Sequence, residues 1–437
     1  MVLLLLSVAI LVVSGFIALL GRRSARIATS IGVGGAVVGC AIGLIPALGV
    51  LLGGEVEFLH LAWSVPYGSF FVQLDALSAF FIVVILAISA LTAIYGGEYL
   101  WPWRDKKLLG PPWFFFDMLV ASMVMVVLAR NGVLFLMAWE VMALSSFFLV
   151  TFEDERESVR VAGRTYLVAT HLGTAFLLVM FILMGREAGS LDFDQFEKLS
   201  GTPKAFGGAS LLFLLAIIGF GTKAGFMPLH VWLPEAHPAA PSHVSALMSG
   251  VMIKMGIYGL VRVLTFLGPP PLWWGWLLVS IGLSSGILGV LFALAQHDLK
   301  RLLAYHSVEN IGIIALGLGV GLLGISEGSP ALVVLGFGGG LLHVANHAVF
   351  KSLLFLGAGA VLHGTGTREI DQLGGILKRM PWTAFTFLIG AVAISGLPPL
   401  NGFVSEFLIY LGAFGGAISL KAGAAVPLFG LTQSCDK

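Results

Sequence analysis

Long runs of hydrophobic residues, separated by short polar segments, recur along the whole chain. A helix needs about 20 mostly apolar residues to cross the hydrocarbon core of a bilayer. Runs of about 18 or more residues therefore predict an all-α polytopic membrane protein with about 13 transmembrane helices. The expected spans are residues 2–20, 27–53, 72–95, 113–129, 132–151, 161–184, 208–236, 242–266, 272–295, 302–324, 330–362, 381–410 and 411–430.

The composition supports a membrane protein. Of the 437 residues, 58% are hydrophobic and only 11% are charged, and the mean hydropathy is +0.99. A soluble domain carries roughly 25% charged residues. The net charge of +1 gives no indication of nucleic-acid binding. The first span lacks a small-residue cleavage site, so we expect a retained helix rather than a signal peptide.

Two segments between spans have a different character. Residues 54–71 mix apolar and polar side chains around a turn at Pro66 and Gly68, which predicts a short hairpin. Residues 186–206 predict a surface loop with a short amphipathic helix.

Basic residues gather in alternate loops, which indicates an orientation. The positive-inside rule places these loops in the cytoplasm and the N-terminus outside. The basic loop residues are Arg22, Arg23, Arg26, Arg104, Lys106, Lys107, Arg156, Arg160, Arg164, Lys300, Arg301, Arg368, Lys378 and Arg379. The opposite loops hold fewer: Arg130, Arg186, Lys198 and Lys204, with Arg262 near one helix end.

Three long spans, 208–236, 330–362 and 381–410, contain glycine or proline, and we expect each to be broken. Breaks at membrane depth are tolerated only where the freed backbone faces protein or a water-filled cavity. Transporters place ion sites at such breaks. A simple kink is the alternative for each break. Ionisable residues lie in or beside all three, which favours function.

Glu140 and Lys223 are ionisable residues inside or beside apolar spans. A charge at the bilayer centre costs at least about 2.5–3.5 kcal/mol, so such residues are rarely accidental. Desolvation disfavours the charged form of either residue alone, whereas a pair stabilises both charges. Two interpretations remain open. The pair is either a switch whose opening releases the lysine proton or a static buried ion pair.

Four further residues lie deep in later spans. Lys254 lies in the middle of its span, which favours a proton relay over a snorkelling side chain. His343, His347 and Lys351 follow an i, i+4, i+8 spacing, which places them on one helix face. Histidine exchanges protons near pH 6.5. A metal site is less favoured because the HExxH glutamate is absent.

Glu406 follows the Pro398–Pro399 pair and is placed to pass a proton to one side of the membrane. Two polar segments either line a water-filled half-channel or form solvated helix caps. Their candidate channel residues are His230, His237, His306 and Glu309.

The cysteines, Cys40 and Cys435, belong to no metal or redox motif, and no glycine-rich phosphate loop is present. We therefore expect no cofactor, no metal and no redox site in this chain. Whether it is an enzyme in its own right stays open.

Several long motifs, in order, resemble the antiporter-like membrane subunits shared by respiratory complex I, multisubunit Na⁺/H⁺ antiporters and energy-converting NiFe hydrogenases. They cover roughly residues 75–410 and include MAWEVMALSSFFLV, GTKAGFMPLHVWLPEAHPAAPSHVSALMSGVMIKMGIYGLVRV, HDLKRLLAYHSVENIG, HVANHAVFKSLLFLGAGAVLH and GLPPLNGFVSEF. HSVENIG, GTGTREIDQLGGI and THLGTAFLL look most like the large membrane subunit of hydrogenase-4 and formate hydrogenlyase.

The resemblance implies roles for the residues that match. Glu140 and Lys223 correspond to the family's Glu–Lys pair, and Lys254 to its central lysine. Lys351 corresponds to the lysine of the second broken helix, with His343 and His347 before it, and Glu406 to the terminal acidic residue.

The resemblance also implies a fold of two inverted five-helix repeats. They would be residues 113–236 and 242–410, which pairs Lys223 with Lys351. Residues 1–112 would form additional N-terminal helices, and residues 411–437 a C-terminal helix. Relatives usually continue with at least one more helix, so we expect a truncated or split C-terminus.

The implied function is proton translocation, driven by a redox complex in the cell inner membrane. The expected partners are other membrane subunits, a peripheral arm like that of a NiFe hydrogenase or NADH dehydrogenase, the lipid bilayer, and protons or Na⁺. The alternatives are a complex I or Na⁺/H⁺ antiporter subunit, a structural anchor without pumping, or an enzyme with its own redox or quinone site. The last is weak because no cofactor ligand set is visible.

Overall fold

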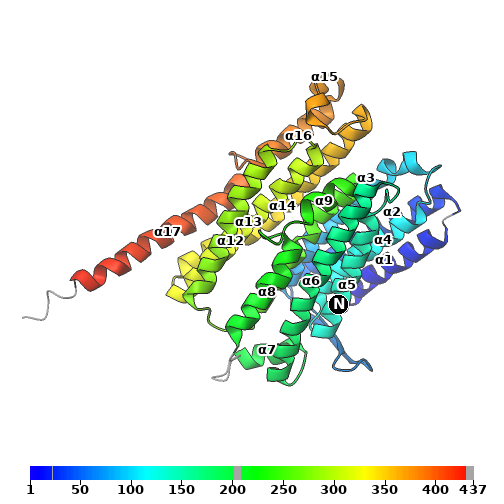
Figure 1. Ribbon diagram of the computed structural model, residues 1–437. Coiled ribbons are helices and arrows are strands. Elements are labelled where there is room, and N and C mark those ends of the chain that lie inside the picture. Colours follow the sequence, from blue (N-terminus) through cyan, green and yellow to red (C-terminus); the bar gives the residue numbers. More distant parts are fainter. Residues whose placement is uncertain (22, 201–207, 430–437) are drawn as a thin grey trace, which may run out of the picture.

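The computed structural model describes residues 1–21, 23–200 and 208–429, with side chains described to residue 416. This part of the chain is almost entirely helical (Figure 1). Ten of its helices are long and apolar enough to cross a membrane. They are α1 (Val2–Leu20), α2 (Ala25–Leu51), α3 (Ala76–Tyr99), α4 (Gly110–Leu128), α5 (Gly132–Val150), α6 (Glu157–Ala188), the combined helix Ser242–Leu264, α12 (Leu272–Leu294), α13 (Leu299–Glu327) and α14 (Pro330–Thr365). The all-helical, polytopic class is confirmed.

The combined helix Ser242–Leu264 consists of α10 (Ser242–Leu247), a π-helical segment η2 (Met248–Met252) and α11 (Lys254–Leu264). Every residue of its 18-residue apolar window is buried inside the protein. It therefore runs through the centre of the bundle, where a polar side chain meets protein rather than lipid.

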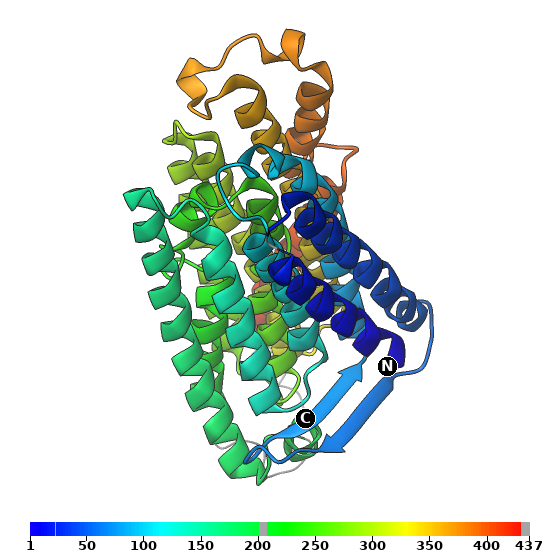
Figure 2. The same cartoon turned by 90° about the vertical axis from the view of Figure 1, so that its right-hand side faces the viewer.

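The predicted hairpin is confirmed. Strands β1 (Glu57–Ala62) and β2 (Ser69–Leu74) pair antiparallel, with Glu57 opposite Leu74. The hairpin lies at one end of the helix bundle (Figure 2). Because β2 occupies residues that were expected to begin a span, α3 starts four residues later than predicted. Asp75 caps this helix, and its Oδ1 accepts a 2.8 Å hydrogen bond from the Ser78 amide.

The loop after α6 contains the expected short helix, α7 (Phe193–Ser200). Residues 201–206 of the predicted loop lie outside the described residues. Asp192 precedes α7 and ties this loop to the rest of the protein. It accepts hydrogen bonds from Asn131 Nδ2, at 2.8 Å, and from the Ser69 hydroxyl of the hairpin.

The break predicted in residues 208–236 is confirmed. Helix α8 (Ala209–Ala224) ends at Gly225, whose φ of 89° is left-handed and favours glycine. After a turn, the short helix α9 (Leu233–Ala239) follows. Trp232 Nε1 donates a 2.8 Å hydrogen bond to the Thr222 carbonyl, which satisfies part of the freed backbone.

The break predicted in residues 330–362 is wrong, because α14 is one continuous helix. Three of the glycines at the predicted break, Gly336, Gly339 and Gly340, face neighbouring helices instead. A Cβ on Gly336 would lie 2.3 Å from the Gly321 amide nitrogen and 2.7 Å from the Gly317 carbonyl oxygen, both on α13. Small residues at helix interfaces let backbones approach closely without breaking the helix. Lys351 therefore lies in an unbroken helix.

A Gly336→Ala variant is expected to lose about 1–3 kcal/mol of unfolding free energy, because the methyl group overpacks the α13–α14 contact. The measurement is unfolding in detergent, followed by circular dichroism. Gly338→Ala is the matched control, since nothing lies within 4 Å of a Cβ there. Equal unfolding midpoints for the two variants would contradict the packing role.

The third predicted break is confirmed, but the last two spans are divided differently. Helix α16 (Pro381–Ile394) is followed by a turn in which Gly396 has a φ of 61°, and α17 (Asn401–Phe429) follows. The predicted boundary at residue 410 is wrong because α17 continues through it. Among the described residues of α17, no glycine takes a positive φ that would end the helix there.

Candidate functional site

Five of the seven predicted translocation residues lie inside the bundle. Lys223 is 2% exposed, and the other four are completely buried: Lys254, His343, His347 and Lys351. Glu140 and Glu406 are half-buried. Charged or polar groups thus occur on α8, α11 and α14 at positions that water does not reach directly from the surface.

Lys223 and Glu140 do not form the predicted direct pair. Lys223 Nζ donates a 3.0 Å hydrogen bond to the Tyr166 hydroxyl and lies 5.7 Å from the centre of the Trp139 ring. Glu140 Oε2 instead lies 3.3 Å from Nε2 of His171. The charges of Glu140 and Lys223 still interact electrostatically. Tyr166 and His171, the partners of Lys223 and Glu140, both lie on α6. This helix therefore connects the glutamate to the lysine.

Tyr166 is a site residue that the sequence analysis missed. Its hydroxyl also hydrogen-bonds the Ser146 hydroxyl of α5, and its ring lies 5.1 Å from that of Trp232. The available signal was weak, since one tyrosine in an apolar span is ordinary. Its role follows only from the fold, which brings α5, α6 and α8 together.

Lys254 is the first residue of α11. One residue, Ile253, separates it from the π-helical segment. Its Nζ donates a hydrogen bond to the Ser249 carbonyl within that segment. The Ser249 hydroxyl is 2.7 Å from that of Ser307 on α13. π-Helical turns are frequent at functional sites because they disturb the regular backbone pairing. Complete burial excludes snorkelling for Lys254.

The α14 residues form a row, as their spacing predicts. The rings of His343 and His347 are stacked, 6.3 Å apart and 7° from parallel. His343 is held at both nitrogens, by Ser405 Oγ at 2.9 Å and Asn310 Oδ1 at 3.1 Å. Among the described residues, neither ring nitrogen of His347 nor Nζ of Lys351 has a hydrogen-bond partner. Buried polar atoms normally pair with protein or ordered water, so this part of the row is suited to hold water.

Glu309 connects the row to Glu406. It interacts electrostatically with both Lys351 and Glu406, and its Oε2 lies 2.5 Å from Nδ1 of His306. The Glu406 carboxylate lies against the turn before α17, where a Cβ on Gly396 would be 2.5 Å from Oε2. The structure therefore places His306 and Glu309 near the row.

The two histidines around α9 differ in their surroundings. His237 is completely buried and interacts electrostatically with Lys254 and Lys351. In the part of the chain that the structure describes, neither of its ring nitrogens has a hydrogen-bond partner. His230 is half-buried, and its ring lies 6.4 Å from that of Tyr305. His237 thus belongs with the central row, whereas His230 lies beside it.

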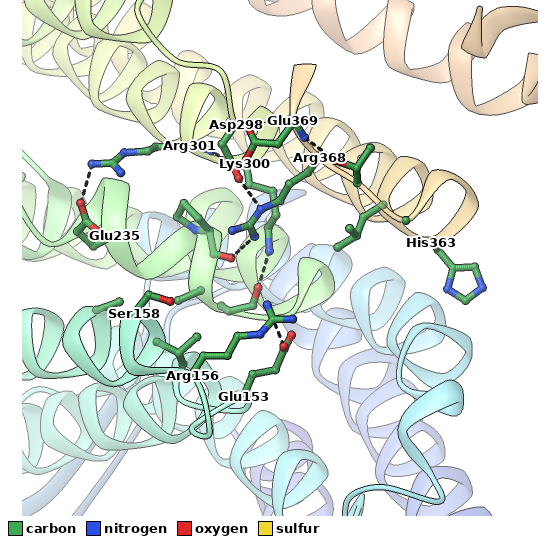
Figure 3. A pocket seen from close by; sticks show the side chains of 18 of the residues that line it. Glu153, Arg156, Ser158, Glu235, Asp298, Lys300, Arg301, His363, Arg368 and Glu369 are labelled. Carbon is green, nitrogen blue, oxygen red and sulfur yellow. Dashed lines mark hydrogen bonds and ion pairs between the residues drawn. The ribbon is translucent and has the colours of Figure 1, made fainter. Parts of the chain in front are cut away.

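A polar cavity of about 740 Å³ opens between α6, α9, the start of α13 and the segment after α14 (Figure 3). Ion pairs line it. Arg301 lies 2.7 Å from Glu235, Arg156 lies 3.1 Å from Glu153, and Arg368 pairs with Asp298. Four of the basic residues assigned to the cytoplasmic loops by sequence therefore line this cavity: Arg156, Lys300, Arg301 and Arg368.

A second buried charge cluster was missed because Arg130 and Arg262 were assigned to loops and helix ends. Both are buried, and both contact Asp75. Arg262 forms two hydrogen bonds to the carboxylate, of 2.7 and 2.8 Å. Burial acts to raise the pKa of Asp75, but the hydrogen bonds from Arg262 and the charges of Arg130 and Arg262 hold that pKa well below its ordinary value.

The chain is similar in sequence to a known family of membrane proteins. A profile of the NADH:quinone oxidoreductase/Mrp antiporter transmembrane family matches residues 129–430. The chain is 45% identical over 396 residues to hydrogenase-4 component B of Escherichia coli K12, covering 90% of this chain and 58% of that protein. It is 39% identical over 347 residues to formate hydrogenlyase subunit 3 of the same strain, covering 79% and 55%. The chain thus spans somewhat more than half the length of these relatives.

Two solved assemblies contain chains of similar structure. The Mrp complex from Dietzia sp. DQ12-45-1b matches with a TM-score of 0.79 and 29% identity, covering 94% of this chain and 43% of that chain. The membrane-bound sulfane sulfur reductase, an archaeal respiratory membrane complex, matches with a TM-score of 0.80 and 27% identity, covering 94% and 67%.

Proposed function

Since the chain belongs to the NADH:quinone oxidoreductase/Mrp antiporter transmembrane family, we propose that it is the ion-translocating membrane subunit of a redox-driven complex of the hydrogenase-4 or formate hydrogenlyase type. The observation that carries the proposal is the row of buried ionisable residues, from Lys223 through Lys254 and Lys351 towards Glu406. Charged groups at this depth are costly, and they mark ion pathways. The identity to two hydrogenase-type subunits supports the class of complex.

Protons enter the row near Lys223 or Lys254 and move along water and His347 to Lys351. From there they pass by Glu309 to Glu406. The hydrogen bond from Lys223 to Tyr166 replaces the direct Glu140–Lys223 pair as the contact that holds the first lysine. A movement of α5 that brings Glu140 closer to Lys223 of α8, or takes it away, alters how firmly the lysine keeps its proton.

We favour protons over Na⁺ as the transported ion. The central row consists of lysine and histidine side chains, which exchange protons. Hard metal cations instead require several oxygen ligands. Among the described residues of the proposed pathway, carboxylates lie towards its ends, with Glu140 at one end and Glu309 and Glu406 at the other.

We also retain the two inverted repeats, residues 113–236 and 242–410, with a different pairing. In both, a short helix ends near a left-handed glycine, and a proline-containing turn follows. These glycines are Gly225 after α8 and Gly396 after α16. The counterpart of the Lys223 helix is then the broken helix next to Glu406, rather than unbroken α14 with Lys351.

The orientation follows from the loop charges, with the arginine-rich cavity in the cytoplasm and the N-terminus outside the inner membrane. The partners are further membrane subunits and a peripheral redox arm that supplies the driving reaction. This chain then contributes ion transfer, and the redox chemistry belongs to the other subunits.

The experiment that tests the function separates pumping from assembly. Lys223→Ala and Lys254→Ala are expected to lower redox-driven acidification of inside-out membrane vesicles at least about tenfold, because each removes a proton-exchanging group. Complex assembly is followed on native gels, and redox turnover in the same vesicles. Lost pumping with intact assembly supports translocation. Unchanged pumping in both variants would leave only a structural anchor.

A further inference from the structure

Lys300 lies in the first turn of α13, between the polar cavity and the buried row. It lines the cavity, yet it is only 1% exposed (Figure 3). Its Nζ donates a hydrogen bond to the carbonyl of Ala240, the residue that follows α9. A lysine is rarely buried to this extent without a charged partner.

Three of the four carboxylates that line the cavity are paired with arginines, and the fourth, Glu369, is exposed. Asp298 pairs with Arg368, Glu153 with Arg156, and Glu235 with Arg301. Within the described residues, no carboxylate lies within ion-pair distance of Lys300. Its Nζ is therefore held by a neutral carbonyl, with Asp298 and Glu153 acting on it from further away.

His237 belongs to α9 but is not among the described residues that line the cavity. Pro234, Glu235 and Pro238 of this helix line the cavity, whereas His237 is completely buried. Lys300 interacts electrostatically with His237, and so do Lys254 and Lys351 of the row. Lys300 at the cavity wall thus interacts with a buried histidine whose two ring nitrogens have no hydrogen-bond partner among the described residues.

We propose that Lys300 is the proton-uptake residue of the chain, taking protons from the cavity and passing them through His237 to Lys254 and Lys351. The inference rests on the proposed function. A proton leaves Nζ for a ring nitrogen of His237, directly or through water, and cavity water then returns a proton to Nζ. Only N–H and O–H bonds form and break.

A purely structural role would be to cap α9. Cations stabilise the carbonyls at a helix C-terminus, and Arg368 also binds one there, through a 2.6 Å hydrogen bond from Nη1 to the Pro238 carbonyl. The two roles differ in one property. A cap needs a cationic donor, whereas an uptake residue must release its proton.

Lys300→Arg distinguishes them, because arginine keeps the charge and the donor groups but is not deprotonated in proteins. We expect Lys300→Arg to lower proton uptake by inside-out vesicles about 100-fold with assembly intact, like Lys300→Met. Full uptake by Lys300→Arg would overturn the proposal. Arg156→Gln, a charge removal in the same cavity, is the control and should change uptake by less than about twofold.

A second measurement uses assembled complex and does not depend on how Lys300 variants fold. Ser158 is exposed and lines the cavity, so Ser158→Cys, in a Cys435→Ser background, can be labelled with a bulky membrane-impermeant thiol reagent. Labelling should reduce proton uptake, whereas labelling Lys378→Cys, outside the cavity, should not. Unchanged uptake after complete labelling of Ser158→Cys would contradict uptake through this cavity.

The outcomes also separate this inference from the proposed function. If Lys223→Ala and Lys254→Ala pump normally, the function itself fails. If they lose pumping while Lys300→Arg retains it, translocation stands and only the uptake role of Lys300 is overturned.

Discussion

A Lys351→Met variant is expected to lower redox-driven proton translocation by about 100-fold while the complex still assembles. Lys351 is completely buried, and its Nζ has no hydrogen-bond partner within the described residues. It also interacts electrostatically with Glu309, which in turn interacts with Glu406. Methionine fills a similar volume without a proton-exchanging group, so packing survives and transfer towards Glu406 stops.

The measurement is vesicle acidification per redox turnover, with assembly checked on native gels. Lys378→Met is the control, because it makes the same substitution at an exposed position in α15 (Ile376–Arg379). The control should pump normally. Normal pumping by Lys351→Met would remove this lysine from the pathway and favour a direct route from His347 to Glu309.

An Asp75→Ala variant is expected to lose about 3–5 kcal/mol of unfolding free energy, because it leaves two buried arginines without their counter-ion. Arg262 contributes two hydrogen bonds to this carboxylate, and Asp75 also caps α3. Unfolding in detergent at neutral pH measures the loss. Asp105→Ala is the control. Its partner Arg104 and Asp105 itself are largely exposed, so less than about 1 kcal/mol should be lost.

The effect should also depend on pH. Asp75 has a lowered pKa in the folded protein, so its contribution to stability is present above the unfolded value of about 3.9 and is lost as the pH falls towards the folded value. The difference in stability between wild type and Asp75→Ala should therefore shrink below about pH 4. A difference that stays constant under acid conditions would argue against a charge effect.

Hydrophobic run length predicted most of the fold, because lipid leaves helices few alternatives. The spans that became α1, α5, α12 and α14 differ from the prediction by at most three residues at either end. The break in α14 was predicted wrongly because glycine has two uses in membrane helices. Gly225 adopts a left-handed conformation and ends a helix, whereas Gly336 makes room for α13. Sequence alone does not distinguish these uses.

For the site, burial of the central lysines and histidines could be predicted from their position in apolar spans. Their hydrogen-bonding and electrostatic partners could not be predicted from the sequence. Tyr166 between Glu140 and Lys223, and Glu309 between Lys351 and Glu406, depend on which helices lie side by side. The same holds for Asp75, which meets Arg262 across 187 positions of the chain.

The unbroken backbone of α14 separates stationary from movable parts of the pathway. Lys223 and Glu406 each lie beside a helix interruption, where a few torsion angles can change without disrupting a whole helix. His343, His347 and Lys351 share one continuous rod and keep their mutual spacing. Under the proposed function, movement at these two interruptions can therefore change the ends of the pathway, while the spacing within α14 stays the same.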